Sequence, residues 1–427
     1  MRDLLDDTVT HLPHHVLIQP LIERHLREDS ALGLVVVNVE GLDAIEESYG
    51  PLEYQRIVRE FSQHLQLLKG KTIRDSDYLA LSELGGSSFM IFLTARRSNN
   101  GKSMRPLKRG DVDHVASRIR DELLMGLIKA LGKHAHGLPK ISIGQAFVVH
   151  NPLIRKRRLI NKLIEEARET ARMHKPILIK HYRDLLHRII VNREIKTHFQ
   201  PILSASTQQV MGLEALSRGP KGTLFESPLA LFSVAEELNL MVELDRLCRQ
   251  TALSYLKHMP PHCKLFVNTL PKGLQDPHLQ KYRPLEAGQE TIVLEINERE
   301  AIGNFETFQK MMETYATHGI GFAVDDVGAG YSSLECIVKL RPKYLKIDRS
   351  LIHEVQSDGV KQDMLKMLSQ FAVRIDAKVV AEGIETKADS DFVREMGIQF
   401  VQGYHYARPM CFDDVVKQGY LRKRTPS

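Results

Sequence analysis

The chain has 427 residues, several times the roughly 100 to 200 residues of a typical domain, which is enough for two domains that each bury a full core. Its net charge of +6 is the small difference between 59 basic and 53 acidic residues, so overall charge predicts no strong binding to nucleic acid or membranes. The four cysteines lie far apart without Cys-x-x-Cys spacing, which argues against a disulfide framework and a thiolate zinc site and fits a reducing cytoplasm.

The N-terminal segment carries acidic residues where a signal peptide would be positively charged. No stretch of the chain approaches the about 18 uninterrupted apolar residues of a membrane-spanning helix. We therefore expect a cytoplasmic protein with no segment inserted in a membrane.

Residues 1–175 alternate between helical and strand-like patterns, which predicts a mixed α/β domain. Alternating apolar residues on both sides of Gly85-Gly86 predict a β-hairpin, because glycine adopts positive φ at the turn without a Cβ clash. Residues 96–111 are polar and are expected to form a surface loop. Helices are expected at residues 17–26 and 54–68, and strands at residues 32–39 and 141–149.

A long charged segment, residues 159–197, has a helical period and predicts a rod between two domains. We place a helical linker at residues 176–192 and the second domain at residues 193–427. The basic run Arg155–Arg158 precedes the rod without interleaved aromatic residues, so it predicts a solvated helix face, and DNA is not expected as a partner. The alternative, nucleic-acid binding by this run and by Arg422–Arg424, predicts an affinity that falls steeply with salt.

In the second half, short apolar runs recur, and each ends in a polar or acidic residue. Helical patterns separate them, and one helix, residues 234–245, is expected to place its acids on a solvent-exposed face. Repeated strand and helix with continuously apolar strands predicts a (β/α)8 barrel rather than an open sheet. Because strand C-termini in a barrel face one mouth, a single site should be surrounded by Asn268, Glu295, Asp325, Asp326, Lys346, Glu382 and Gln402.

Carboxylates brought this close repel one another unless cations neutralise them, so the cluster predicts bound metal. Oxygen-rich ligands with one amide and no His or Cys favour Mg²⁺ or Mn²⁺ over zinc. The adjacent Asp325 and Asp326 suit two ions, which is the arrangement of many phosphoryl-transfer sites. A single acid more often caps a helix or forms a surface ion pair than binds a metal. Neither of these roles explains why so many acids stand together at the ends of strands.

These motifs closely resemble the EAL phosphodiesterases of bacterial cyclic di-GMP signalling, from about residue 193 to residue 410. The resemblance rests on motifs in the same order along the chain: Gln200-Pro201-Ile202, Glu214-Ala215-Leu216 with Arg218, Phe266-Val267-Asn268, residues 294–298, residues 325–333, residues 345–349, residues 381–385 and Gln402-Gly403-Tyr404.

The resemblance implies a barrel whose first strand is reversed, two bound Mg²⁺ or Mn²⁺ ions, and hydrolysis of cyclic di-GMP to linear pGpG. Lys346, Glu382 and Glu214 would be catalytic, with Lys346 contacting the attacking water. Glu298 would anchor the loop after Asp326. The implied metal ligands are Glu214, Asn268, Glu295, Asp325, Asp326 and Glu382, and the implied substrate contacts are Gln200, Leu216, Arg218 and Gln402.

Three positions depart from the family pattern. Val327 stands where the family usually has Phe, Ala329 where it has Thr, and Asn297 where it has Thr. None of them is an implied metal ligand. The departures therefore concern the geometry of the loop after Asp326, and through it the rate of hydrolysis or its coupling to dimer formation.

The first half resembles, less closely, the GGDEF diguanylate cyclase domain that often precedes EAL, through residues 7–13 and 34–50. The chain lacks the acids that cyclisation needs to hold metal on GTP. Asn38, Glu46, Gln55 and Ser87-Ser88 replace the family's functional residues, so cyclase activity is not expected. Residues 74–77 are similar to the family's inhibitory product site but are spaced about two residues too far from Gly85, and product binding there stays an alternative.

The leading hypothesis is therefore a homodimeric phosphodiesterase with a GGDEF-like regulatory domain that binds GTP or a regulatory protein. The alternative is a receptor that binds cyclic di-GMP without cleaving it. A receptor of this kind would bind cyclic di-GMP without turnover. Such a protein would have no reason to retain every metal ligand of the enzyme family.

Overall fold

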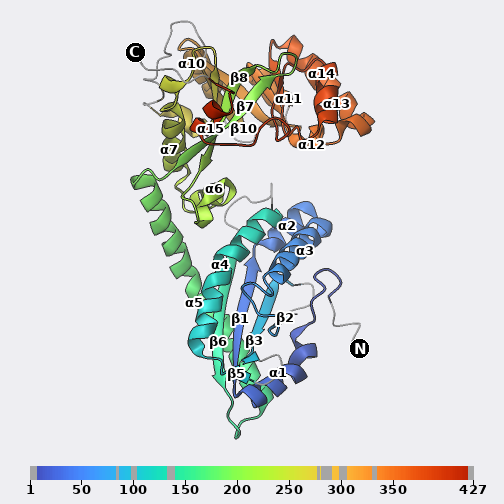
Figure 1. The fold of residues 1–427 in the computed structure, drawn as a ribbon, viewed down its shortest axis with the longest axis vertical. Coiled ribbons are helices and arrows are strands. Elements are labelled where there is room, and N and C mark those ends of the chain that lie inside the picture. The colour runs from blue at the N-terminus through green and yellow to red at the C-terminus, as the bar shows by residue number, and fades with distance from the viewer. Residues whose placement is uncertain are drawn as a thin grey trace. The chain divides into compact units, whose positions relative to one another are not determined.

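The computed structural model describes residues 7–82, 86–97, 103–131, 140–276, 279, 291–297, 305–328 and 334–421. The chain forms two compact units, the first comprising Met1–His187 with Leu229–Leu238 and the second comprising Arg188–Pro228 with Asn239–Ser427 (Figure 1). Each unit is described by itself below.

The first unit contains an antiparallel sheet with strand order β2-β3-β1-β6. The hairpin predicted around Gly85-Gly86 is formed by β2 and β3, and Ser82 N donates to Ser88 O at its end (2.9 Å). Glu83, Leu84 and Gly85 lie outside the described residues. The strands are β1 (Ala31–Glu40), β2 (Tyr78–Leu81), β3 (Ser88–Leu93) and β6 (Lys140–Val149).

Helices pack on both faces of this sheet. Alternate residues of β1, such as Leu34 and Val36, belong to a buried cluster with α1 (His15–Asp29) and α5 (Lys156–Val191). Gly144 lets α5 approach β6 closely, because a Cβ there would lie 2.0 Å from Ala167 O. The other face meets α3 and α4 (Figure 1). The remaining helices of this unit are α2 (Leu42–Tyr49), α3 (Pro51–Leu67), α4 (Arg109–Leu131) and α6 (Pro228–Glu237).

Three sequence expectations are wrong in detail. The helical rod ends at Val191 rather than Thr197, because Arg193 adopts a left-handed backbone (φ 57°) and β7 begins at Lys196. The expected loop at residues 96–111 contains the paired strands β4 (Arg96–Arg97) and β5 (Ser103–Arg105) and the start of α4. Residues 234–245 form the end of α6 and the start of α7, because Asn239 is left-handed (φ 57°) and interrupts the helix.

The second unit is the predicted eight-stranded closed barrel, with order β10-β11-β12-β13-β14-β7-β8-β9. The first strand, β7, runs antiparallel to both of its neighbours, as the family resemblance implies, and the other pairs are parallel. The strands are β7 (Lys196–Ser204), β8 (Val210–Arg218), β9 (Lys264–Asn268), β10 (Ile292–Asn297), β11 (Ile320–Val327), β12 (Tyr344–Ile347), β13 (Lys378–Ala381) and β14 (Phe400–Val401).

Helices surround the barrel, and outward-facing strand residues such as Leu294 and Leu345 join a large buried cluster with Leu365 and Leu368 of α13. The helices are α7 (Met241–Leu253), α10 (Phe305–Ala316), α11 (Leu334–Leu340), α12 (Arg349–Ile352), α13 (Gly359–Arg374), α14 (Lys387–Glu395) and α15 (Phe412–Lys417), with single 3-10 turns η2 (Leu224–Glu226), η3 (Leu256–His258), η4 (Pro271–Gln275) and η5 (Val355–Ser357). Within the described ranges, none of the helices has the length and apolarity needed to cross a membrane.

Candidate active site

The barrel interior is built in two layers that follow from strand geometry. The lower layer is apolar and consists of Ile202, Phe266, Val293, Ala323, Tyr344 and Val380. Successive side chains of a strand point to opposite faces, so the residue two positions further points inward again. On the parallel strands these positions carry Asn268, Glu295, Asp325, Lys346 and Glu382, and on the reversed β7 the corresponding residue is Gln200, two positions before Ile202.

Lys346 lies at the centre of this polar layer and is completely buried. Its Nζ lies 2.7 Å from Glu295 Oε1 and 2.7 Å from Glu382 Oε1. Asp325 Oδ1 lies at 3.1 Å and Glu214 Oε1 at 3.3 Å. Four predicted site acids from four different strands or strand ends therefore converge on one predicted site lysine.

The charges in this cluster are strongly coupled. Burial raises the pKa of Glu295 well above its usual range, the Lys346 ammonium opposes this, and the neighbouring acids reinforce it. Burial, with the charge of Asp325, likewise raises the pKa of Glu382. Burial favours the neutral form of Lys346, but the four carboxylates outweigh it and raise the pKa of the lysine well above its usual range. One ammonium cannot neutralise four carboxylates, so the site demands protons or further cations.

The donor set fits a hard divalent ion. The contacting side-chain atoms of the acids are carboxylate oxygens, and oxygen ligands suit Mg²⁺ and Mn²⁺. In the part of the chain that the structure describes, no three His, Cys, Asp or Glu side chains form a ready coordination shell. Instead the ammonium of Lys346 lies where the carboxylate oxygens converge.

Two further predicted ligands lie beside this cluster. Asn268 ends β9, and its Nδ2 donates to Glu295 Oε2 (3.0 Å) and, more weakly, to Glu214 Oε1 (3.5 Å). Asp326 lies within the bulge between Val324 and Val327 and adopts a left-handed backbone (φ 58°), with its N–H donating to Asp325 Oδ1 (3.1 Å). β-Bulges redirect side chains at strand ends, so this bulge accounts for two adjacent aspartates at one edge.

The predicted substrate contacts Gln200 and Gln402 form an oriented pair of amides. Gln200 Nε2 donates to Ala407 O (3.0 Å), which leaves its Oε1 to accept from Gln402 Nε2 (3.1 Å). Gln402 Nε2 also donates to Glu214 Oε2. Gln402 Oε1 is buried and has no partner among the described residues, so it is available to accept a hydrogen bond from a ligand.

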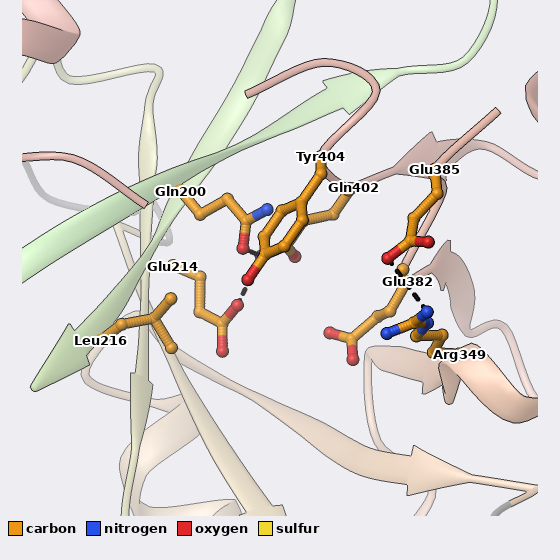
Figure 2. Close-up of a pocket in the computed structure, with 10 residues that line it drawn as sticks. Gln200, Glu214, Leu216, Arg349, Glu382, Glu385, Gln402 and Tyr404 are labelled. Carbon is orange, nitrogen blue, oxygen red and sulfur yellow. Dashed lines mark hydrogen bonds and ion pairs between the residues drawn. The ribbon is translucent and has the colours of Figure 1, made fainter. Parts of the chain in front are cut away.

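A pocket opens at this edge, and Figure 2 shows Gln200 and Glu214 on one side of it and Arg349, Glu382 and Glu385 on the other. Its lining residues are Gln200, Glu214, Leu216, Arg349, Glu382, Gly383, Glu385, Gln402, Gly403 and Tyr404. The predicted Leu216 is among them. The predicted Arg218 is not, and its Nη1 donates to Ser217 O (2.8 Å), while burial lowers the pKa of its guanidinium.

Sequence reasoning missed three side chains of this pocket, those of Arg349, Glu385 and Tyr404. Arg349 pairs with Glu385 (3.1 Å), and the guanidinium of Arg408 lies 4.4 Å from the ring centre of Tyr404. The sequence could have indicated two of these residues, because each ends a motif on which the family resemblance rests. Arg349 directly follows the Lys346-Ile347-Asp348 segment, and Glu385 is the last of residues 381–385. The predicted loop anchor Glu298 and the departure Ala329 lie outside the described residues.

In the first unit, neutral side chains of three neighbouring strands form a hydrogen-bonded chain. Ser88 Oγ donates to Asn38 Oδ1 (2.7 Å), and Asn38 Nδ2 donates to Ser142 Oγ (3.3 Å). Glu46 is exposed on α2 and Gln55 lies on α3. At residues 74–77, Asp77 accepts hydrogen bonds from Thr94 N (2.9 Å) and Arg74 N (3.1 Å), so this buried carboxylate holds the local fold.

Comparison with known proteins adds to this geometry. The EAL domain profile matches residues 183–409, which is more than half of the chain. The chain belongs to the EAL domain family. A crystal structure of an EAL domain protein from Listeria monocytogenes shares the barrel fold, with a TM-score of 0.50 and 24% identity over 54% of this chain and 94% of that one.

Two curated relatives show the range of similarity. The bifunctional diguanylate cyclase/cyclic di-GMP phosphodiesterase MucR of Pseudomonas aeruginosa is 24% identical over 95% of this EAL chain and 60% of its own length. The probable cyclic di-GMP phosphodiesterase PdeN of Escherichia coli is 31% identical over 53% of this chain and 45% of its own length. The chain thus spans only about half the length of these relatives.

Proposed function

We propose that this EAL chain hydrolyses cyclic di-GMP to linear pGpG with the help of two divalent metal ions. The observation that carries the proposal is the convergence of Glu214, Glu295, Asp325 and Glu382 on Lys346 beside an open pocket. The choice of substrate is supported by the names of MucR, a bifunctional diguanylate cyclase/cyclic di-GMP phosphodiesterase, and PdeN, a probable cyclic di-GMP phosphodiesterase.

Mg²⁺ or Mn²⁺ would be held by the oxygen ligands at the barrel mouth. When bound, such ions polarise phosphoryl oxygens and lower the pKa of water. The excess of negative charge around Lys346 supports their presence. The proposed ligands are Glu214, Asn268, Glu295, Asp325, Asp326 and Glu382.

The chain's own groups supply binding, orientation and charge. Lys346, kept protonated by four carboxylates, donates a hydrogen bond to the attacking water, and Glu214 and Glu382 hold the ammonium in place. The water oxygen bonds to phosphorus and releases a proton, the bond from phosphorus to the 3′ oxygen breaks, and the 3′ oxygen takes up one proton to become the free hydroxyl of pGpG.

Substrate binding falls to the groups that line or border the pocket. Gln402 Oε1 accepts from the nucleotide, and Gln200 keeps the Gln402 amide in this orientation. Leu216 contributes an apolar wall. Arg218, at the end of β8, supplies positive charge for a phosphate.

The first unit acts as a regulatory domain without cyclase activity, binding GTP or a regulatory protein. The neutral Asn38, Ser88 and Ser142 cannot supply the charge that Mg²⁺ requires of carboxylates. We place the protein in the cytoplasm, where the unpaired thiols of Cys248, Cys263 and Cys411 fit a reducing environment.

The proposed homodimer is supported by an apolar stripe on α13. Val360, Met364 and Met367 are 78%, 39% and 48% exposed, and their spacing places them on one helix face. A dimer that uses this stripe becomes monomeric in Val360→Asp with Met367→Asp, as measured by light scattering. An unchanged mass would reject this surface.

The reaction is tested with the full chain, cyclic di-GMP and Mn²⁺ or Mg²⁺, with pGpG quantified by chromatography. Wild type is expected to release pGpG, and chelation is expected to stop it. Glu214→Ala should lower turnover by roughly 100-fold or more, whereas Glu243→Ala, which removes an exposed acid of α7, should leave turnover unchanged. Folded wild type that binds cyclic di-GMP without releasing pGpG would instead be the non-hydrolysing receptor.

A further inference from the structure

A second buried ionic cluster lies in the barrel unit, on helix α7. Arg249 is 2% exposed, and its Nη1 donates to Asp245 while its Nη2 donates to Asp276 Oδ2 (2.9 Å). Arg246 adds a hydrogen bond to Asp276 Oδ1 (3.0 Å). We name Asp245, Arg249 and Asp276 the Arg249 cluster. The prediction that Asp245 faces solvent is therefore wrong, because α7 begins only after the break at Asn239 and turns this acid inward.

Buried ion pairs cost desolvation and are often replaceable by apolar residues without loss of stability. Stability alone is therefore a weak explanation for the Arg249 cluster, and its contacts suggest a more specific one. Arg249 Nη1 donates to Thr269 Oγ1 (2.9 Å), and Asp245 Oδ1 accepts from Leu270 N (3.1 Å). Both anchored residues directly follow Asn268.

Asn268 lies where the strand ladder is incomplete. β9 pairs with β8 only as far as Val267, whereas its pairing with β10 continues to Asn268, and Thr269 N donates to Glu295 O (3.0 Å). From Asn268 onward the chain is therefore held by β10 on one side. Side chains of α7 supply further contacts to Thr269 and Leu270.

The turn η4 that follows is fitted closely to the same cluster. A Cβ on Gly273 would lie 2.5 Å from Asp245 Oδ2 and 2.6 Å from Arg249 Nη1, so only glycine allows this approach. Leu274, one residue later, is buried, and its carbonyl accepts a hydrogen bond from Tyr315. Residues 269–274 are thus fixed from the helix side of the barrel.

We propose that Arg249 is a positioning residue for Asn268, holding residues 269 and 270 so that the Asn268 side chain stays against Glu295 and Glu214. This inference rests on the proposed function, because it treats Asn268 as a ligand of the divalent ions. Groups that orient metal ligands typically change metal affinity or activity by about 10- to 100-fold when they are removed.

The test uses full-length protein and measures Mn²⁺ binding to the metal-free chain by titration calorimetry, without nucleotide. Thr269→Val removes the hydroxyl anchor at constant shape, whereas Thr269→Ser keeps it. Arg249→Met removes the guanidinium that donates to Asp245, Thr269 and Asp276. Arg394→Met is the matched control, because it removes an exposed ion pair with Asp391 (2.8 Å) on α14.

We expect Arg249→Met and Thr269→Val to bind Mn²⁺ about 10-fold more weakly than wild type, and Thr269→Ser and Arg394→Met to match wild type. With cyclic di-GMP, the two weakened variants should need more Mn²⁺ for half-maximal turnover at an unchanged KM for the nucleotide. If Arg249→Met does not fold, the pair Thr269→Val and Thr269→Ser decides.

Folded Thr269→Val or Arg249→Met that binds Mn²⁺ as tightly as wild type overturns the inference while leaving the proposed reaction intact. Weakened Mn²⁺ binding in these variants, with wild type that releases no pGpG, supports the inference and rejects the reaction. Wild type that binds no Mn²⁺ overturns both.

Discussion

Lys346 Nζ lies 2.7 Å from Glu295 Oε1, and the two side chains are only 1% and 0% exposed. Loss of this ammonium would leave buried carboxylates without a counter-charge, which is far costlier than a buried pair. Three further carboxylates contact the same ammonium, so the cluster remains short of positive charge even with the lysine in place. The first two predictions follow from this imbalance.

Replacing Lys346 by Met should lower the free energy of unfolding of the metal-free chain by about 3–5 kcal/mol. Saturating Mn²⁺ should recover part of this loss, because divalent ions supply the missing charge and binding stabilises the folded state. Urea unfolding with and without Mn²⁺ measures both effects. Lys417→Met, which removes an exposed pair with Asp414, should change little, and a Lys346→Met loss no larger than this control would contradict the prediction.

The raised pKa of Glu295 predicts that the free energy of unfolding of the metal-free chain depends on pH. Its pKa is raised in the folded state from an ordinary value of 4.5, first by burial. The folded chain therefore keeps this proton at pH values where the unfolded chain has released it, and the stabilising contribution, complete below pH 4.5, is lost as the pH rises toward the folded-state pKa.

Glu295→Gln does not titrate, so it isolates this effect. The free energy of unfolding of wild type minus that of Glu295→Gln should fall as the pH rises above 4.5 in chelator. Chemical unfolding at a series of pH values measures the difference. A difference that stays constant or rises with pH would refute the assignment.

Much of this site follows from strand periodicity. The sequence predicts polar residues at the strand ends, and strand periodicity explains the apolar layer found beneath them, because Val293 and Glu295, or Tyr344 and Lys346, are two residues apart on one strand face. The reversed direction of β7 was implied only by the family resemblance. No periodicity distinguishes a reversed strand, because alternation reads the same in both directions.

Other features depend on tertiary structure that a local pattern does not encode. Asp245 has the helical spacing of a solvated acid, but α7 begins only after the break at Asn239, and there Asp245 is buried against Arg249 and Leu270 N. Tyr404 and Arg349 reach the pocket from beyond the strand ends, where chain direction is set by loops. Residues 96–111 look like a loop because a two-residue strand such as β4 is too short to show a period.

The contact between Gln402 and Glu214 gives a double-mutant test. Gln402→Glu replaces a donor by an acceptor beside Glu214, so it should raise the KM for cyclic di-GMP and lower stability by about 1–3 kcal/mol. Adding Glu214→Gln to Gln402→Glu restores the hydrogen bond in the opposite direction, with the new amide at position 214 donating to the new carboxylate at position 402. Thermal and urea unfolding of the four proteins should show a favourable coupling of about 1 kcal/mol, whereas additive effects would mean that the contact is not made.

The hydrogen bonds that Asp77 accepts predict a purely structural role for its carboxylate in the first unit. Asp77→Ala removes the acceptor for Thr94 N and Arg74 N in a buried turn and should destabilise this unit by about 1–3 kcal/mol. Release of pGpG by the folded protein should be unchanged. Loss of a second cyclic di-GMP binding event in calorimetry, without loss of stability, would instead favour the product-site alternative.

The central claim, that the cluster around Lys346 cleaves cyclic di-GMP, is tested most directly in a single turnover. Full-length protein in excess over cyclic di-GMP is mixed with Mn²⁺ in isotopically labelled water, and the nucleotides are analysed by mass spectrometry. The account predicts that all cyclic di-GMP becomes pGpG carrying one labelled oxygen on its terminal phosphate, and that Glu214→Ala leaves it cyclic. Bound cyclic di-GMP that stays intact on folded, Mn²⁺-loaded wild type would contradict it.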